Sequence, residues 1–129
     1  MLRSLLIVSL IALSPAVAVA SDTTALKTQL QAAMQRTQER SLVDGAIVNV
    51  DLETGESEQL YPTEAHPMIL TMGDMYVMCA TLRTESGEKR LVDYYLAQDG
   101  KRFKLVRTEI ENRKPLQALI KAGVAKRLK

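Results

Sequence analysis

Two apolar runs joined by a polar turn constrain this chain most, because together they predict a β-hairpin at its centre. The runs occupy residues 76–82 and 91–96, and Ser86 and Gly87 lie in the turn between them. In the first run, apolar side chains occupy both sets of alternating positions, so both faces of the predicted strand are apolar. A strand covered on both faces is typical of the centre of a sheet.

Helical and strand patterns flank this hairpin on both sides. Residues 24–40 carry a narrow apolar stripe at helical spacing, and residues 46–52 change to the alternation of a strand. Near the C-terminal end, Pro115 opens a second helix, which Gly123 ends, and a basic tail follows. The remaining segments are predicted as strands at residues 58–61, 68–72 and 102–110, with a loop at residues 63–67.

This order of elements predicts an α+β fold. No strand–helix–strand alternation is present to build a parallel sheet. We therefore expect an N-terminal helix, an antiparallel meander of about five strands and a C-terminal helix packed on one sheet face, with both helices on the same face. Residues 21–129 are long enough for a single small domain and too short for two.

The first twenty residues have the pattern of a secretory signal peptide. Arg3 supplies the charged start, residues 5–13 are apolar, and Ala18 and Ala20 form a small-x-small cleavage site. The apolar run falls short of the roughly 20 residues that span a bilayer, so no transmembrane anchor is expected. Cys79 is the single cysteine and cannot form an internal disulfide. We expect an exported protein, in the periplasm or, as the alternative, outside the cell.

Charge is distributed unevenly along the chain. Residues 41–100 hold eleven acids and three bases, whereas residues 101–129 hold ten bases and two acids. Either the basic C-terminal region lies against acidic neighbours such as Asp93 and Glu88, or it forms an exposed patch for an anionic surface. The chain has only five aromatic residues, and none alternates with the basic cluster, which argues against specific nucleic acid recognition.

Candidate metal ligands are densest in residues 66–79. Thioether, imidazole and thiolate groups together suit Cu(I). Because neighbouring strand positions point to opposite faces, only a subset could converge on one ion, and we take as this subset His66, Met68, Met72 and Met75. The alternative is that the methionines fill gaps in the core.

A cysteine hydrolase is a further alternative, with Cys79 activated by His66 and oriented by Asp74. Cys79 lies in an apolar strand, where burial raises the pKa of a thiol and makes it inert. No other catalytic motif is present in the sequence. We therefore assign no catalytic residue and do not expect an enzyme.

Asp93 is a charged residue on an apolar strand face that it shares with Tyr95. It either pairs with a base on the neighbouring strand, Lys104 or Arg102, or opens a polar pocket. Such a pocket would lie between the sheet and a helix, with Asp93, Tyr95 and His66 as its polar contacts. The resulting hypothesis is a non-enzymatic binding or accessory domain, monomer or homodimer, for a protein or small ligand whose identity the sequence does not reveal.

Overall fold

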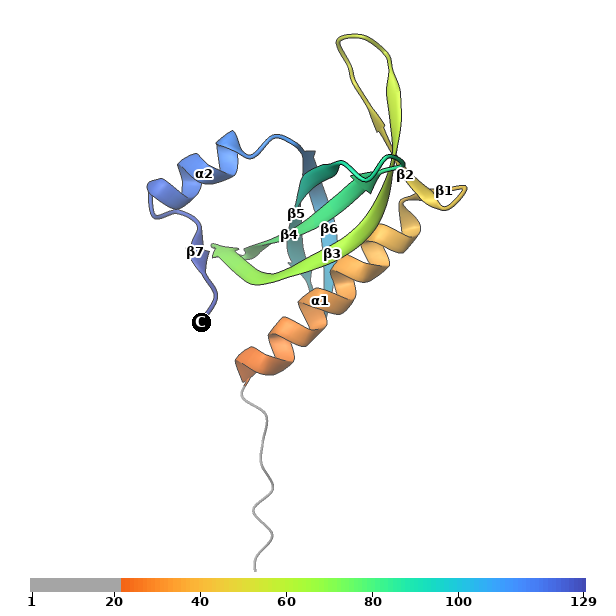
Figure 1. Cartoon of the computed structure of the whole chain (residues 1–129). Coiled ribbons are helices and arrows are strands. Elements are labelled where there is room, and N and C mark those ends of the chain that lie inside the picture. Colours follow the sequence, from red (N-terminus) through yellow and green to blue (C-terminus); the bar gives the residue numbers. More distant parts are fainter. Residues whose placement is uncertain (1–21) are drawn as a thin grey trace, which may run out of the picture.

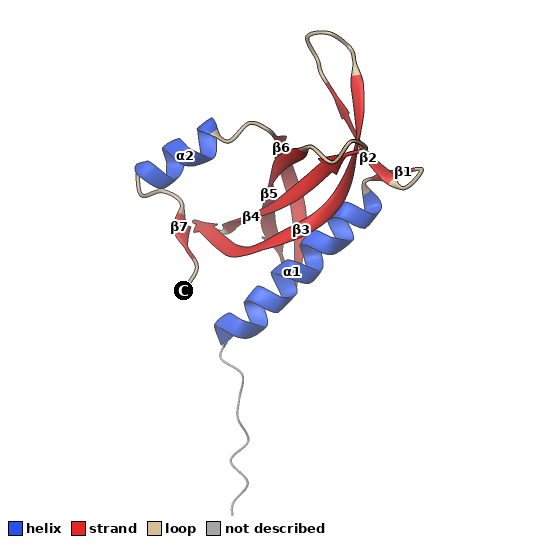
Figure 2. Ribbon diagram, in the orientation of Figure 1, coloured by secondary structure: helices blue, strands red, loops and turns tan. Residues whose placement is uncertain are grey.

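The computed structural model describes residues 22–129, so the predicted signal peptide lies outside the described residues. A long helix, a six-stranded antiparallel meander, a short helix and a final two-residue strand follow one another (Figures 1 and 2). Their bounds are α1 Asp22–Arg40, β1 Leu42–Val43, β2 Ala46–Val50, β3 Ser57–Met72, β4 Met75–Thr84, β5 Lys89–Asp99, β6 Arg102–Ile110, α2 Lys114–Lys121 and β7 Lys126–Arg127. The α+β class and the antiparallel meander are confirmed.

The predicted hairpin is β4 and β5, which pair from Met75 opposite Ala97 to Arg83 opposite Lys89. Every residue from 77 to 82 is buried, so β4 is covered on both faces as expected. The two faces lead to two separate clusters. Met78, Ala80 and Leu82 belong to one cluster, while Val77 and Cys79 belong to the other.

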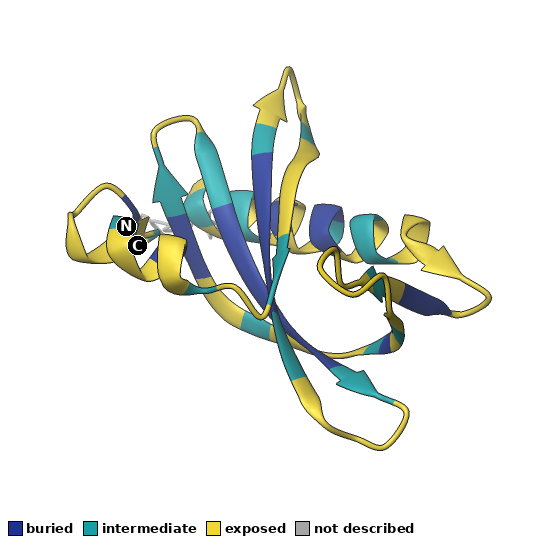
Figure 3. Ribbon diagram, turned by 90° about the horizontal axis from the view of Figure 1, so that it is seen from above, coloured by how far each residue is buried: buried dark blue, intermediate teal, exposed yellow. Residues whose placement is uncertain are grey.

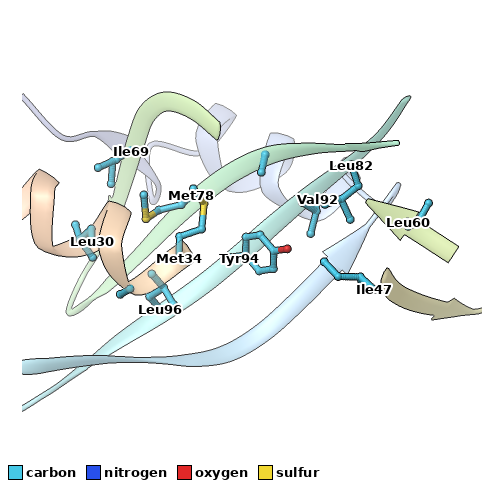
Figure 4. Packing of buried hydrophobic residues seen from close by; sticks show 12 residues of the cluster. Leu30, Met34, Ile47, Leu60, Ile69, Met78, Leu82, Val92, Tyr94 and Leu96 are labelled. Atoms are coloured by element: carbon cyan, nitrogen blue, oxygen red, sulfur yellow. The ribbon is translucent and has the colours of Figure 1, made fainter. Parts of the chain in front are cut away.

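The two helices cover opposite faces of the sheet. Leu30 and Met34 of α1 pack against Met78 and Leu96, as the close view of the core shows (Figure 4). Leu116 of α2 packs in the other cluster, and α2 covers only one end of its face (Figure 3). The C-terminal helix thus packs on one sheet face as expected, but α1 does not share that face. The sequence could not reveal this, because β4 and β5 are apolar on both sides.

β3 is longer than its sequence pattern suggests. The predicted strands at residues 58–61 and 68–72 are parts of one strand of 16 residues, and residues 63–67, expected as a loop, continue it with two shifts of register against β4. Bulges of this kind add residues to one strand without breaking the pairing. On its other edge β3 pairs with β2 up to Leu60 and with β7 from Leu70. Between them, within residues 22–129, the edge at residues 61–68 pairs with no strand and contains Pro62 and Pro67.

The end of the chain is part of the packed structure. β7 pairs with Leu70 and Thr71 of β3, and the Leu128 N–H donates a hydrogen bond to the Ile69 carbonyl at 2.8 Å. Ala125 is buried at 2% exposure and Leu128 packs against the α1-side cluster. The segment that the sequence pattern presents as a basic tail therefore closes one edge of the sheet.

We expect deletion of residues 124–129 to destabilise the domain. The deletion removes a buried alanine, a half-buried leucine and backbone hydrogen bonds worth about 1 kcal/mol each, so the free energy of unfolding should fall by about 2 kcal/mol. Urea unfolding followed by circular dichroism measures this difference. An unchanged midpoint would show that β7 contributes nothing to the fold.

Candidate functional site

A charged residue lies in the middle of the sheet face that α2 covers in part. Asp93 of β5 is directly opposite Cys79 of β4 on one side and Glu109 of β6 on the other. The side chain of Asp93 is only 1% exposed. Two carboxylates directly opposite each other on neighbouring strands repel, so this part of the sheet needs bases close by.

Two arginines that lie outside β5 are the bases close to these carboxylates. Arg107 and Asn112 hydrogen-bond to Glu109 and hold the pKa of that carboxyl below its ordinary value, with Asn112 the larger cause. Arg113, the residue before α2, reaches back over the sheet to Asp93. Its Nε atom donates a hydrogen bond to Oδ2 at 3.3 Å, and its Nη2 atom lies 3.2 Å from the Sγ atom of Cys79. We call Cys79, Asp93 and Arg113 the polar centre.

One oxygen of the polar centre has no hydrogen bond. The Nη2 atom of Arg113 lies 3.2 Å from Asp93 Oδ1, close enough for an ion pair, but the two atoms are not aligned for a hydrogen bond. Oδ1 is fully buried and is the only such unsatisfied side-chain oxygen or nitrogen in residues 22–129. Buried polar atoms are normally satisfied, so this oxygen calls for an explanation.

The cysteine of the polar centre is held as a neutral thiol. Burial raises the pKa of Cys79 to about 12, and the neighbouring Asp93 carboxylate adds to the rise. A thiolate is the nucleophilic form of cysteine, and almost none is present at neutral pH with such a pKa. The Arg113 guanidinium favours the thiolate but is the smaller influence.

His66 lies beside the polar centre on the adjacent strand. It belongs to the irregular part of β3 between Ala65 and Ile69, and its Nε2 atom is 2.8 Å from the Oγ1 atom of Thr81. Thr81 is buried and lies two residues along β4 from Cys79. Bulges often re-aim a side chain, and here the irregular stretch brings the half-buried imidazole to β4.

Tyr95 occupies the covered end of the same face. It lies opposite Val77, packs in the cluster that contains Leu116 of α2, and is 6% exposed. No contact joins the three predicted ligand contacts within residues 22–129, so their joint role stays a prediction. Asp93 and Tyr95 share a face two residues apart on β5, and His66 approaches from β3. Asp93 and His66 adjoin the uncovered part of this face, whereas Tyr95 lies beneath α2.

Sequence reasoning missed Arg113 as the partner of Asp93. The expected ion pair with Lys104 or Arg102 is wrong, because the sheet register places both bases at the far end of β6 and Lys104 pairs with Asp99 at 2.6 Å. Arg113 is on no strand, so the alternation of side chains along a strand could not indicate it. A signal was present, however, since a carboxylate on an apolar face needs a base and Arg113 is the first base after β6.

The four predicted copper ligands do not come together. Met72 and Met75 lie opposite each other across the β3–β4 turn and pack in the α2-side cluster, whereas Met68 is 48% exposed. His66 lies six positions before Met72 along β3, or roughly 20 Å at about 3.3 Å per residue. Residues 22–129 contain no cluster of three or more His, Cys, Asp or Glu side chains arranged to hold a metal ion. Copper binding by a smaller subset stays a prediction.

The groups proposed for a cysteine hydrolase are also dispersed. Cys79 contacts Arg113, His66 contacts Thr81, and Asp74 lies exposed in the β3–β4 turn. A nucleophile and its base need to lie within hydrogen-bonding reach of each other. Within residues 22–129, the contacts of Cys79 and His66 are with other residues and not with each other.

A groove lies elsewhere, between α1 and the unpaired part of β3. It encloses about 800 Å³ and is lined largely by glutamine, threonine and small side chains. None of His66, Asp93 and Tyr95 lines it. Glu64 lines this groove, and the hydrogen bond from Arg83 lowers the pKa of its carboxyl.

Comparisons with family models, with curated proteins and with solved structures found no match. Among the described residues, no helix has the length and apolar character needed to cross a bilayer. Any statement about function therefore depends on the residues of this chain.

Proposed function

We propose that this protein is a non-enzymatic binding domain that holds a small polar ligand at the polar centre. The observation that carries the proposal is the Oδ1 atom of Asp93, which is buried and accepts no hydrogen bond. Leaving a buried acceptor unsatisfied costs about 1–3 kcal/mol. A ligand that donates a hydrogen bond to this oxygen adds to the ion pair that Oδ1 makes with Arg113 and recovers part of that free energy, so the centre favours occupancy.

The chemistry of the centre selects the class of ligand. Asp93 needs a hydrogen-bond donor, and the Arg113 guanidinium carries five N–H donors and needs an acceptor. A group that combines the two side by side is an amide, as in a carboxamide or a peptide bond. The ligand in this proposal therefore presents an amide N–H to Asp93 and the adjoining carbonyl oxygen to Arg113.

Arg113 also provides the route of entry. About a third of its side chain is exposed (32%), whereas the side chain of Asp93 is 1% exposed, so Arg113 is the outer member of the pair. Its contact with the Cys79 thiol is a weak one, because sulfur is a poor acceptor. Rotation of the guanidinium away from Sγ opens Oδ1 while the Nε hydrogen bond to Oδ2 is kept. Thr81, two residues from Cys79 on β4, and His66, which contacts it, lie further along the sheet.

Several observations favour binding over catalysis. The Cys79 thiol, with a pKa of about 12, is not a nucleophile at neutral pH, and the imidazole of His66 is engaged with Thr81. The polar groups of the centre are otherwise paired with one another rather than aimed at a common point. This arrangement can recognise a ligand but supplies no activated group to attack it.

We further propose that the domain acts after export, in the periplasm or outside the cell, as a monomer or homodimer. The support is the signal-peptide pattern of residues 1–20, with cleavage after Ala20. An antiparallel domain without a disulfide is compatible with a periplasmic location, since its fold does not depend on the redox state of the compartment.

Native mass spectrometry of the protein purified from its own export compartment tests these proposals together. The spectrum should show a chain beginning at Ser21, its subunit count and a retained organic mass. The Arg113→Lys variant keeps the charge but loses the guanidinium fork, so it should retain at least tenfold less of that mass. Arg107→Lys, a similar change at the neighbouring ion pair, should retain it fully.

Two results would count against the ligand. One is a wild-type spectrum without added mass, combined with an unchanged Tm when N-acetylated dipeptide amides are added as probes. The other is equal retention by the Arg113→Lys and wild-type proteins. A chain that still carries residues 1–20 would refute cleavage and leave the ligand proposal to be judged on the retained mass alone.

A further inference from the structure

The last part of the chain, residues 114–129, carries positive charge that the fold does not neutralise. This segment, which we call the basic cap, contains α2, the turn after it and β7, and it holds five bases and no acid. Of the five bases in residues 101–113, three form ion pairs within the fold: Lys104 with Asp99, Arg107 with Glu109 and Arg113 with Asp93. Within residues 22–129, none of the five bases of the cap forms an ion pair, and all are exposed: Lys114, Lys121, Lys126, Arg127 and Lys129.

The basic cap also exposes two aliphatic side chains. Ile120 in the last turn of α2 is 46% exposed, and Val124 in the following turn is 51% exposed. The turn between them is compact. The Gly123 N–H donates to the Ile120 carbonyl and the Val124 N–H to the Leu119 carbonyl, both at 3.0 Å. This is the Schellman arrangement, and Gly123 adopts the left-handed conformation that it requires, with φ of 73°.

The inner side of the basic cap is anchored, which leaves its outer side free. Leu116 and Ala125 are buried, and with Leu119 they pack against Leu70 and Tyr95 of the sheet. α2 therefore lies against one end of the sheet, with most of its own residues exposed at the edge of the molecule (Figure 3). Two of the bases, Lys126 and Arg127, lie in β7, and their backbone is held in place by pairing with β3.

Unneutralised bases around exposed aliphatic side chains match one kind of partner. An anionic lipid bilayer offers phosphate groups to the bases and an apolar interior to shallow side chains. Lysine and arginine side chains close to such a surface are attracted to it electrostatically. A nucleic acid is a poorer match, because residues 114–129 contain no aromatic residue for base stacking. We propose that the basic cap docks the domain reversibly on an anionic membrane surface.

Sedimentation with lipid vesicles tests the docking. The mature protein should bind vesicles of mixed phosphatidylglycerol and phosphatidylcholine and should not bind vesicles of phosphatidylcholine alone. Raising the salt from about 0.05 M to 0.5 M should release it, since the Debye length falls below 10 Å over that range. Absence of binding to the anionic vesicles, or equal binding to both kinds, would overturn the proposal.

Matched variants locate the surface. Lys121→Glu/Lys126→Glu should weaken binding at least tenfold, and Ile120→Ser/Val124→Ser should weaken it with less effect on the salt dependence. Arg36→Glu/Arg40→Glu makes the same change in net charge on exposed positions of α1, across the sheet, and should bind almost as wild type. Equal losses in the two charge-reversal variants would show that only net charge matters and would overturn the assignment to the cap.

The docking surface and the polar centre can be separated experimentally. Circular dichroism melting shows whether each variant is folded, so a loss of binding is not confused with unfolding. Arg113→Lys should still bind anionic vesicles, since it keeps its charge and lies outside the basic cap. A variant that loses both the retained ligand and vesicle binding while still folded would show that the two surfaces act as one.

Discussion

Iodoacetamide should alkylate Cys79 in the native protein at pH 8 about a thousandfold more slowly than in the urea-unfolded chain. The folded domain raises the pKa of this thiol from its ordinary value of 9.0 to about 12, chiefly through burial. Three pKa units reduce the thiolate fraction roughly a thousandfold, and the thiolate is the form that reacts. The rate should keep rising with pH up to at least pH 10. Quenched-flow labelling and mass spectrometry give both rates.

The same shift sets a direction for stability at high pH. A pKa that is raised in the folded state contributes stability that is fully present below pH 9 and is lost as the pH rises towards 12. Cys79→Ala should remove this component, which separates it from the titration of lysines and tyrosines. Fast alkylation at pH 8 would contradict the whole account and would revive a nucleophilic role for Cys79.

Replacement of Arg113 by methionine should lower the free energy of unfolding by about 3 kcal/mol, because it leaves the buried Asp93 carboxylate without its counter-charge. Breaking a fully buried ion pair costs about 3–5 kcal/mol, and the partial exposure of Arg113 places this pair at the lower end. For a domain of this size the loss corresponds to a fall in Tm of about 10–20 °C. Urea unfolding and thermal melting measure the two quantities.

A double variant distinguishes the ion pair from simple packing. Removing both charges in Asp93→Leu/Arg113→Met leaves no unpaired group, so it should recover most of the stability that the single change loses. Arg107→Met, at the exposed neighbouring pair, should cost less than 1 kcal/mol. If the single and double variants were equally unstable, the arginine would act through its aliphatic stem rather than its charge.

The sequence was sufficient to predict those parts of the fold whose pattern is local. β4 and β5 follow from their apolar runs, and the antiparallel order follows from the turns between strands. Two features did not follow from a local pattern. The irregular part of β3 contains Pro62 and Pro67, which predict a loop, yet the strand continues through both because bulges absorb them. β1 was missed because two residues are too few to show a period.

The candidate site was predictable only in part, for a related reason. Alternate residues of a strand point to the same face, so the sequence alone places Asp93 and Tyr95 on one face of β5. The approach of Arg113 depends on how the chain turns after β6, which no repeating pattern encodes. The faces occupied by α1 and α2 were equally undetermined, since both faces of β4 are apolar and either could receive a helix.

The unpaired stretch of β3 is a free strand edge at which another copy of the sheet could add a strand. A free strand edge is a template on which another chain can add a strand, and natural proteins block such edges with prolines and bulges. Residues 61–68 carry both, since Pro62 and Pro67 cannot donate to a ladder, and the register shifts at residues 62–64 and 65–69 interrupt the regular spacing of the backbone groups. The gap between β2 and β7 is therefore protected against edge-to-edge aggregation, and a homodimer of this domain would not form by adding a strand at this edge.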